Sequence, residues 1–193
     1  MTNSSGNIDL DKLSALAKLM RRKILDISFK CNQSAHIGGA LSMVDIMSAL
    51  YGTVLNFDST NPHWENRDRF ILSKGHGVLA YYAALLLSDI ISSETFETFQ
   101  TNESHLIAHP VMNLDLGIES SNGSLGHGLS LGIGIALAAK KKNKEFNTYV
   151  FMGDGECNEG SIWEGLMCAS QFKLDNLTAI VDYNKFQLSL IHI

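Results

Sequence analysis

The sequence predicts an α/β domain built around a parallel β-sheet. Two short apolar segments, residues 148–152 and 177–181, have the length and composition of strands, and the segment between them, residues 161–172, has the periodicity of a helix. A strand–helix–strand unit of this kind places its two strands parallel and side by side. A third apolar segment, residues 69–72, precedes another helical segment at residues 78–87, which continues the alternation.

The N-terminal part of the chain is predicted to be mainly helical. Apolar residues recur at spacings of three and four between residues 9 and 30, with charged residues between them, which predicts a helix. Residues 31–40 contain two adjacent glycines and predict a loop. The segment SMVD at residues 42–45 resembles a capping box, so we expect a second helix from there to about residue 55. The polar residues 58–68 predict a surface loop.

The central part of the chain is predicted to combine helices with one long irregular segment. Residues 93–100 predict a short helix, and residues 129–144 predict a longer one. Residues 103–128 lack apolar periodicity, and irregular segments of this length inside compact domains are usually functional or disordered. Because this segment contains His105, His109 and several glycines, we expect it to be functional.

Composition narrows the class of protein. With 193 residues, 45% apolar and 18% charged, the chain can bury a core within a single domain, residues 1–193. The net charge of −5 argues against nucleic-acid binding. The N-terminus lacks the regions of a signal peptide, and no apolar stretch is long enough to span a membrane. Three cysteines without CxxC spacing favour a reducing, cytoplasmic location.

The strongest functional signal lies in the turns that follow the two strands of the strand–helix–strand unit. The first turn contains Gly153, Asp154 and Gly155, and the second contains Asn184. In a parallel sheet both turns lie at the carboxyl ends of strands, where open α/β sheets bind ligands. A carboxylate, an amide oxygen and a nearby main-chain carbonyl suit Mg²⁺ or Ca²⁺ rather than zinc, with water and ligand phosphates completing the coordination. The glycines allow a phosphate to approach the main chain closely.

Each turn also has a simpler explanation when it is considered alone. Asp154 can cap the following helix, and Asn184 can occupy an unrelated turn. The presence of both after consecutive parallel strands favours the cation site. Residues 155–160 lack the Lys-Ser/Thr ending of a P-loop, and neither residues 123–134 nor residues 153–160 match GxGxxG, which disfavours generic nucleotide binding.

Several segments of the chain resemble transketolase, in the order in which that family carries them. GDG followed by the later asparagine resembles the thiamine diphosphate motif. The segments are SAHIGGALS (34–42), ILSKGHG (71–77), AHP (108–110), NGSLGHGLS (122–130), GDGECNEGSIWEG (153–165) and DNLTAIVDYNKFQ (175–187). The chain is most similar to the separate N-terminal subunit of split bacterial transketolases. The resemblance implies the three-layer fold of a diphosphate-binding domain, a parallel sheet with helices on both faces.

The resemblance implies a site for thiamine diphosphate and Mg²⁺, or Ca²⁺ or Mn²⁺ in its place. Asp154 and Asn184 would be side-chain ligands of the cation, and the main-chain carbonyl of Phe186 would be the third protein ligand. The residues expected to contact the cofactor or its cation are His76, Gly123, Leu125, Gly126, Gly153, Asp154, Gly155 and Asn184.

The resemblance also implies roles for four residues in catalysis. His76 would face the diphosphate and substrate, while His36 and His109 would reach the carbonyl and hydroxyl groups of a sugar, and imidazole titrates in the pH range that such chemistry needs. Glu159 matches a carboxylate that the family uses at the interface with its partner. His127 adjoins the cofactor loop, and a cofactor contact and a structural contact explain it equally well.

The implied activity is transfer of a two-carbon ketol unit from a ketose to an aldose, with sugars or sugar phosphates of pentose phosphate metabolism as substrates. In the family, a catalytic glutamate lies in a second, pyrimidine-binding domain, so we expect a homo- or hetero-oligomer that needs a C-terminal partner subunit. The alternatives are another thiamine diphosphate enzyme, such as deoxyxylulose-phosphate synthase, or a non-catalytic truncated fragment. Residues 188–193 depart from the family pattern, which suggests truncation.

Overall fold

The computed structural model describes residues 8–185 and contains a parallel sheet of three strands in the order β1-β2-β3. The strands are β1 (Arg69–Leu72), β2 (Thr148–Gly153) and β3 (Leu177–Asp182). In the register of the sheet Leu72 lies opposite Phe151, and Gly153 lies opposite Asp182. The chain therefore leaves all three strands at the same edge.

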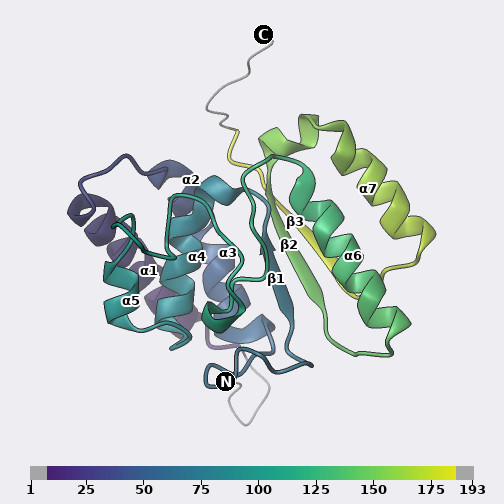
Figure 1. Ribbon diagram of the computed structural model, residues 1–193, viewed down its shortest axis with the longest axis horizontal. Helices are drawn as coiled ribbons and strands as arrows, with labels where there is room; N and C mark the ends of the chain where they lie inside the picture. The colour runs from purple at the N-terminus through teal and green to yellow at the C-terminus, as the bar shows by residue number, and fades with distance from the viewer. Residues whose placement is uncertain (1–7, 186–193) are drawn as a thin grey trace.

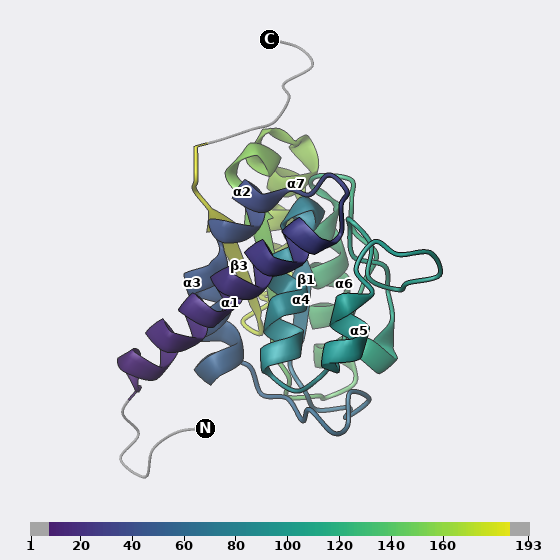
Figure 2. The same cartoon turned by 90° about the vertical axis from the view of Figure 1, so that its left-hand side faces the viewer.

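Helices cover both faces of this sheet, which confirms the predicted three-layer α/β class (Figure 1). The helices on one face are α1 (Leu10–Lys30), α2 (Ile37–Leu41), α3 (Val44–Ala49), α4 (Val78–Leu87) and α5 (Ser93–Glu97). Within this layer α1 crosses α4 diagonally (Figure 2). The helices on the other face are α6 (His127–Lys141) and α7 (Gly160–Gln171).

The alternation of side chains along the strands produces two separate cores. Phe70 and Phe151 point into a large core with the layer of α1, α3 and α4. Ile71, Val150 and Met152, which alternate with them, pack under α6 and α7 in a smaller core. Successive side chains of a strand point to opposite faces, so an apolar run without alternation is the pattern of a strand that is buried on both sides.

The helix at residues 9–30 and the elements at residues 69–72 and 78–87 lie where the sequence predicts them. Asp9 caps α1, because its side chain accepts a hydrogen bond from the main-chain N–H of Lys12 at 3.0 Å. The short helix predicted at residues 93–100 ends at Glu97. Short helical turns also occur at Gly75–Gly77, Leu114–Leu116 and Asp154–Asn158.

Three expectations for residues 31–55 were wrong. The predicted loop at 31–40 turns into α2 at Ile37, and the predicted capping box does not form. Ser42 does not cap α3; its hydroxyl donates instead to the Asp182 carboxylate at 2.6 Å. The expected single helix to about residue 55 changes after Ala49 into a π-helical turn, Leu50–Val54. The Ser42 hydroxyl thus bonds to a residue at the end of β3 instead of capping the helix that follows it in the chain.

None of the helices within residues 8–185 combines the length and apolar character that crossing a membrane requires. The tail predicted at residues 188–193 lies outside the described residues.

Candidate functional site at the carboxyl edge of the sheet

The turns after β2 and β3 meet directly at the carboxyl edge of the sheet. Asp154, which is half-buried, accepts hydrogen bonds from the main-chain N–H of Gly155 at 3.1 Å and from that of Lys185 at 2.8 Å. The second bond joins the turn after β2 to the turn after β3. Asn184 is therefore one residue from a direct partner of Asp154, as the order of parallel strands predicts.

The amide of Asn184 faces inward. Its Nδ2 atom lies 3.4 Å from the Ser42 hydroxyl oxygen and 3.5 Å from Oδ2 of Asp182. Phe186, the third expected cation ligand, lies outside the described residues.

A buried carboxylate, Glu156, holds three of the site's loops together. Its side chain is buried and accepts hydrogen bonds from the Ser73 hydroxyl at 2.6 Å and from the main-chain N–H groups of Gly126 and Gly153, each at 2.9 Å. Ser73 directly follows β1, Gly126 directly precedes α6, and Gly153 is the last residue of β2. Satisfying both oxygens is what makes such a buried carboxylate tolerable. Sequence reasoning missed this role, although Glu156 directly follows the GDG segment.

A second buried acid, Asp182, pairs with a buried base. The Lys74 ammonium lies 2.5 Å from Oδ2 of Asp182, and the lysine side chain is 0% exposed. The Ser42 hydroxyl donates to the same carboxylate oxygen at 2.6 Å. Sequence reasoning missed this cluster too; the only signal was a charged residue at the carboxyl end of each of two predicted strands.

The loop before α6 approaches the start of α7 closely. Gly126 has a φ of +82°, in the left-handed region that favours glycine, and a Cβ atom there would lie 2.5 Å from the Ser161 hydroxyl oxygen and 2.8 Å from Cβ of Glu159. A Cβ atom on Gly123 would meet only the ring of His109, at 3.8 Å. Gly123 itself is exposed in this loop.

Three histidines from distant parts of the chain come together at this edge. The ring of His36, at the start of α2, lies 5.9 Å from the ring of His76 and 5.9 Å from that of His109, measured between centroids. Gly39 leaves space for the His76 ring, since a Cβ atom there would lie 2.7 Å from its Cδ2 atom. The long segment that carries His109 therefore reaches the same edge of the sheet as His36 and His76.

The environment of His76 and His109 lowers the pKa of each imidazole. Burial, the Lys74 ammonium and the neighbouring imidazoles lower the pKa of His76 from 6.5 to about 4. Burial and His36 also lower the pKa of His109. A neutral imidazole can both donate and accept a hydrogen bond, which suits contacts with hydroxyl and carbonyl groups near pH 7.

The other predicted residues lie around this centre. Glu159 is exposed immediately before α7, and its N–H donates to the main-chain carbonyl of Glu156 at 2.9 Å. Leu125 is half-buried in the loop before α6. His127 is the exposed first residue of that helix. Its position leaves both a cofactor contact and a structural contact open.

The donor atoms at this edge fit a divalent cation whose coordination is completed by a phosphate ligand. Asp154 and Asn184, both half-buried, provide hard oxygen atoms. Within residues 8–185, no group of three or more His, Cys, Asp or Glu side chains could hold a metal on its own. Two side-chain ligands leave coordination positions that water and the oxygen atoms of a bound phosphate can fill.

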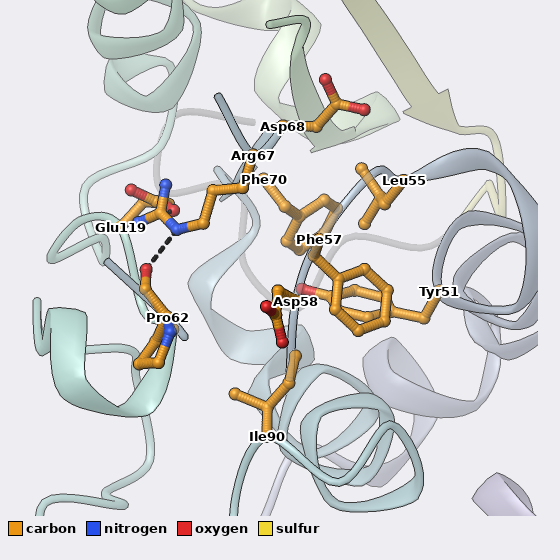
Figure 3. A pocket seen from close by; sticks show the side chains of 11 residues that line it. Tyr51, Leu55, Phe57, Asp58, Pro62, Arg67, Asp68, Phe70, Ile90 and Glu119 are labelled. Atoms are coloured by element: carbon orange, nitrogen blue, oxygen red, sulfur yellow. Dashed lines mark hydrogen bonds and ion pairs between the residues drawn. The ribbon is translucent and has the colours of Figure 1, made fainter. Parts of the chain in front are cut away.

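A cavity at the opposite, amino-terminal end of the sheet has a different character (Figure 3). Its volume is about 30 Å³, room for little more than a water molecule, and Tyr51, Phe57 and Ile90 line it. The Arg67 guanidinium pairs there with Glu119 at 2.7 Å and also donates to the carbonyl of Pro62. This ion pair anchors the long segment 103–128 to the residues before β1.

Fold and site together define a ligand-binding α/β domain whose site lies at the carboxyl ends of parallel strands. Residues 14–189 match the family model described as "Transketolase, thiamine diphosphate binding domain". The chain belongs to this family, and its domain is a thiamine diphosphate-binding domain.

Several relatives carry transketolase names. The chain is 43% identical to an apulose-4-phosphate transketolase subunit of Actinobacillus succinogenes, over 95% of this chain and 66% of that protein. It is 42% identical to a 6-deoxy-6-sulfo-D-fructose transketolase subunit of a Clostridium species, over 79% of this chain and 56% of that protein. The crystal structure of transketolase from Campylobacter jejuni superposes with a TM-score of 0.86 at 32% identity, covering 93% of this chain and 29% of that one. The chain thus spans two thirds or less of these relatives.

Proposed function

We propose that this chain provides the diphosphate- and cation-binding part of a transketolase, which transfers a two-carbon ketol unit from a ketose to an aldose together with a pyrimidine-binding partner subunit. The hydrogen bond between Lys185 N–H and Asp154 carries the proposal, because it joins the turn that contains Asp154 to the turn that contains Asn184. The names of the relatives support the reaction class and an organisation in separate subunits. Those names specify different sugars, so the sugar specificity of this chain is left open.

Each residue of the site has a defined task in this proposal. Asp154 and Asn184 hold Mg²⁺, or Ca²⁺ or Mn²⁺ in its place, with the carbonyl of Phe186 as the third protein ligand. The main-chain N–H of Gly155, which donates to the Asp154 carboxylate at 3.1 Å in this structure, turns to the diphosphate when the cofactor binds. Gly123 lets the loop lie against the cofactor. When bound, thiamine diphosphate supplies the nucleophilic carbon of the reaction.

The histidines serve the substrate. His36 and His109 hydrogen-bond to sugar hydroxyl and carbonyl groups, and His76 lies between the substrate and the diphosphate. Because the imidazoles of His76 and His109 are neutral near pH 7, they exchange protons with these groups without adding a fixed charge. Glu159, exposed beside the loop before α6, contacts the partner subunit.

Binding of the cofactor tests this proposal. We expect calorimetry to show that the chain, with its partner subunit present, binds thiamine diphosphate in the presence of Mg²⁺. The variant Asp154→Ala removes a charged cation ligand and should weaken this binding at least about 100-fold, a loss of about 2.7 kcal/mol. Asp175→Ala is the matched control, because this exposed carboxylate forms a surface ion pair with Lys140. Equal affinities for wild type and Asp154→Ala would refute the site.

A further inference from the structure

The buried pair of Lys74 and Asp182 needs an explanation beyond stability. Their charged atoms lie 2.5 Å apart, with side-chain exposures of 0% and 8%. Bringing two charges out of water costs nearly as much as their attraction returns, and a well-packed apolar pair of similar size often serves a fold equally well. The pair lies at the carboxyl edge of the sheet, next to an expected cation ligand. Its location suggests that it serves the site.

The carboxylate of Asp182 organises polar groups from three parts of the chain. Its Oδ2 atom accepts from Lys74, which follows β1, and from the hydroxyl of Ser42, which follows α2. The same atom lies 3.5 Å from Nδ2 of Asn184, two residues further along the chain. Ser42 reinforces this arrangement, because its oxygen lies 3.4 Å from the same Nδ2 atom.

This arrangement selects one of the two orientations of the Asn184 amide. An ionised carboxylate only accepts hydrogen bonds, so the amide must turn its NH₂ group, not its oxygen, toward Asp182. The reverse orientation would place two oxygen atoms against each other. An amide can bind a divalent cation only through its oxygen, so an inward NH₂ group is a requirement of the cation site. Lys74 supplies the charge that allows the carboxylate to lie buried.

We propose that Lys74, Asp182 and Ser42 are positioning residues that fix the Asn184 amide with its nitrogen inward, the orientation in which its oxygen binds the cation. This inference rests on the proposed function, because it assigns Asn184 to the cation. It predicts that the cluster controls the affinity for Mg²⁺ and contributes little to the stability of the fold. Partners that orient a metal ligand typically change metal affinity by about 10- to 100-fold when they are removed.

Two variants separate positioning from stability. Lys74→Met/Asp182→Leu removes both charges together, so that no unpaired charge stays buried, and Ser42→Ala keeps the ion pair. The matched control is Lys30→Met/Glu97→Leu, which removes an exposed lysine–glutamate pair, 2.8 Å apart, between α1 and α5. We measure Mg²⁺ affinity by calorimetry at saturating thiamine diphosphate, in the presence of the partner, and thermal unfolding of each variant without cofactor.

We expect the double variant to bind Mg²⁺ about 10- to 100-fold more weakly and Ser42→Ala several-fold more weakly, while the control binds as wild type. The thermal midpoint of the double variant should stay near that of wild type. If the double variant does not fold, Ser42→Ala decides the outcome, because it leaves the buried charges paired. A cofactor-free readout is the hydrogen exchange of the Asn184 side-chain amide by NMR, assigned with Asn184→Asp; exchange should be faster in both cluster variants.

The outcomes separate this inference from the proposed function. Failure of the wild-type complex to bind Mg²⁺ and thiamine diphosphate would overturn both. Normal binding by wild type together with unchanged Mg²⁺ affinity in the cluster variants would overturn the positioning role alone. A loss of thiamine diphosphate binding in the variants that is equally large in metal-free buffer would also overturn it, because Lys74 would then act on the diphosphate directly.

Discussion

His76 shows how the position of a single residue sets its chemistry. It follows β1, lies beside the buried Lys74 ammonium and shares the edge of the sheet with His36 and His109. Burial and these positive or titratable neighbours disfavour the imidazolium ion, and only Asp182 acts in the opposite direction. Near pH 7 the His76 ring is therefore neutral, and it can both donate and accept a hydrogen bond.

The lowered pKa of His76 predicts a loss of stability in mild acid. Above about pH 6.5 the imidazole is neutral in the folded and the unfolded chain, so it makes no difference to the free energy of unfolding. Between pH 6.5 and about pH 4 only the unfolded chain takes up the proton, and the free energy of unfolding falls as the pH is lowered. Replacing His76 by Gln should flatten the pH dependence of unfolding in this window.

Denaturant titrations at several pH values between 4 and 7 measure this effect. His63→Gln is the control, because His63 is exposed and its ring pairs with Asp115 at the surface. Parallel pH profiles for wild type and His76→Gln would contradict the lowered pKa.

At the scale of one element, α6 shows how small residues bring a helix close to the sheet. Gly128, Gly132 and Ala136 recur every four residues and form the buried face of the helix. A Cβ atom on Gly128 would overlap the side chain of Ser73, and one on Gly132 would overlap Cγ2 of Val150. This close packing places the start of α6, and with it the loop that carries Gly123 and Gly126, against the carboxyl edge.

The glycines of α6 provide a matched pair of substitutions. Gly132→Ala adds a methyl group against Val150, and such overpacking costs about 1–3 kcal/mol, which outweighs the gain in helix propensity. Gly134→Ala makes the same chemical change two residues away, where nothing lies within 4 Å of the new methyl group. It should stabilise the protein by about 0.5–1 kcal/mol. Chemical denaturation measures both, and stabilisation by Gly132→Ala would show that α6 packs less closely than described.

At the scale of the whole molecule, α7 and β3 leave large apolar side chains exposed. Trp163 and Met167 of α7 are 59% and 67% exposed, and Val181 of β3 is 42% exposed. Exposed apolar surface is typical of regions that bind another protein or domain. This surface agrees with the proposal that the thiamine diphosphate-binding domain works together with a pyrimidine-binding subunit.

Activity should therefore depend on a second component. We expect the purified chain to show no ketol transfer between a ketose phosphate and an aldose phosphate, because the residues that act on the pyrimidine ring belong to the proposed partner. Addition of the proposed pyrimidine-binding partner subunit should produce turnover, measured by chromatography of the sugar products. Asp154→Ala with the same partner is the inactive control. Substantial turnover by the chain alone would contradict the dependence on a partner.

The sequence predicted the main chain of the site better than its side-chain network. Asp154 and Asn184 were predicted to meet because each follows a strand of one parallel unit, and the link between Asp154 and Lys185 brings their turns together. The three histidines were found through the resemblance of their segments, and the structure places the His36 ring 5.9 Å from each of the other two. Glu156 and Lys74 were missed, because nothing local distinguishes a buried, paired charge from an exposed one.

The sequence by itself determined the strands, the long helices and the edge of the sheet where the turns meet, since short apolar runs and a periodicity of 3.6 are local properties of the chain. Only the tertiary structure decided what Ser42 does. Its local pattern favours a helix cap, but its hydroxyl finds the Asp182 carboxylate, which is 140 residues away. A buried charge must be paired or hydrogen-bonded, and its partners can come from any part of the chain that the fold places beside it. Those partners come from separate elements, so the network that orients Asn184 exists only once the layers have packed.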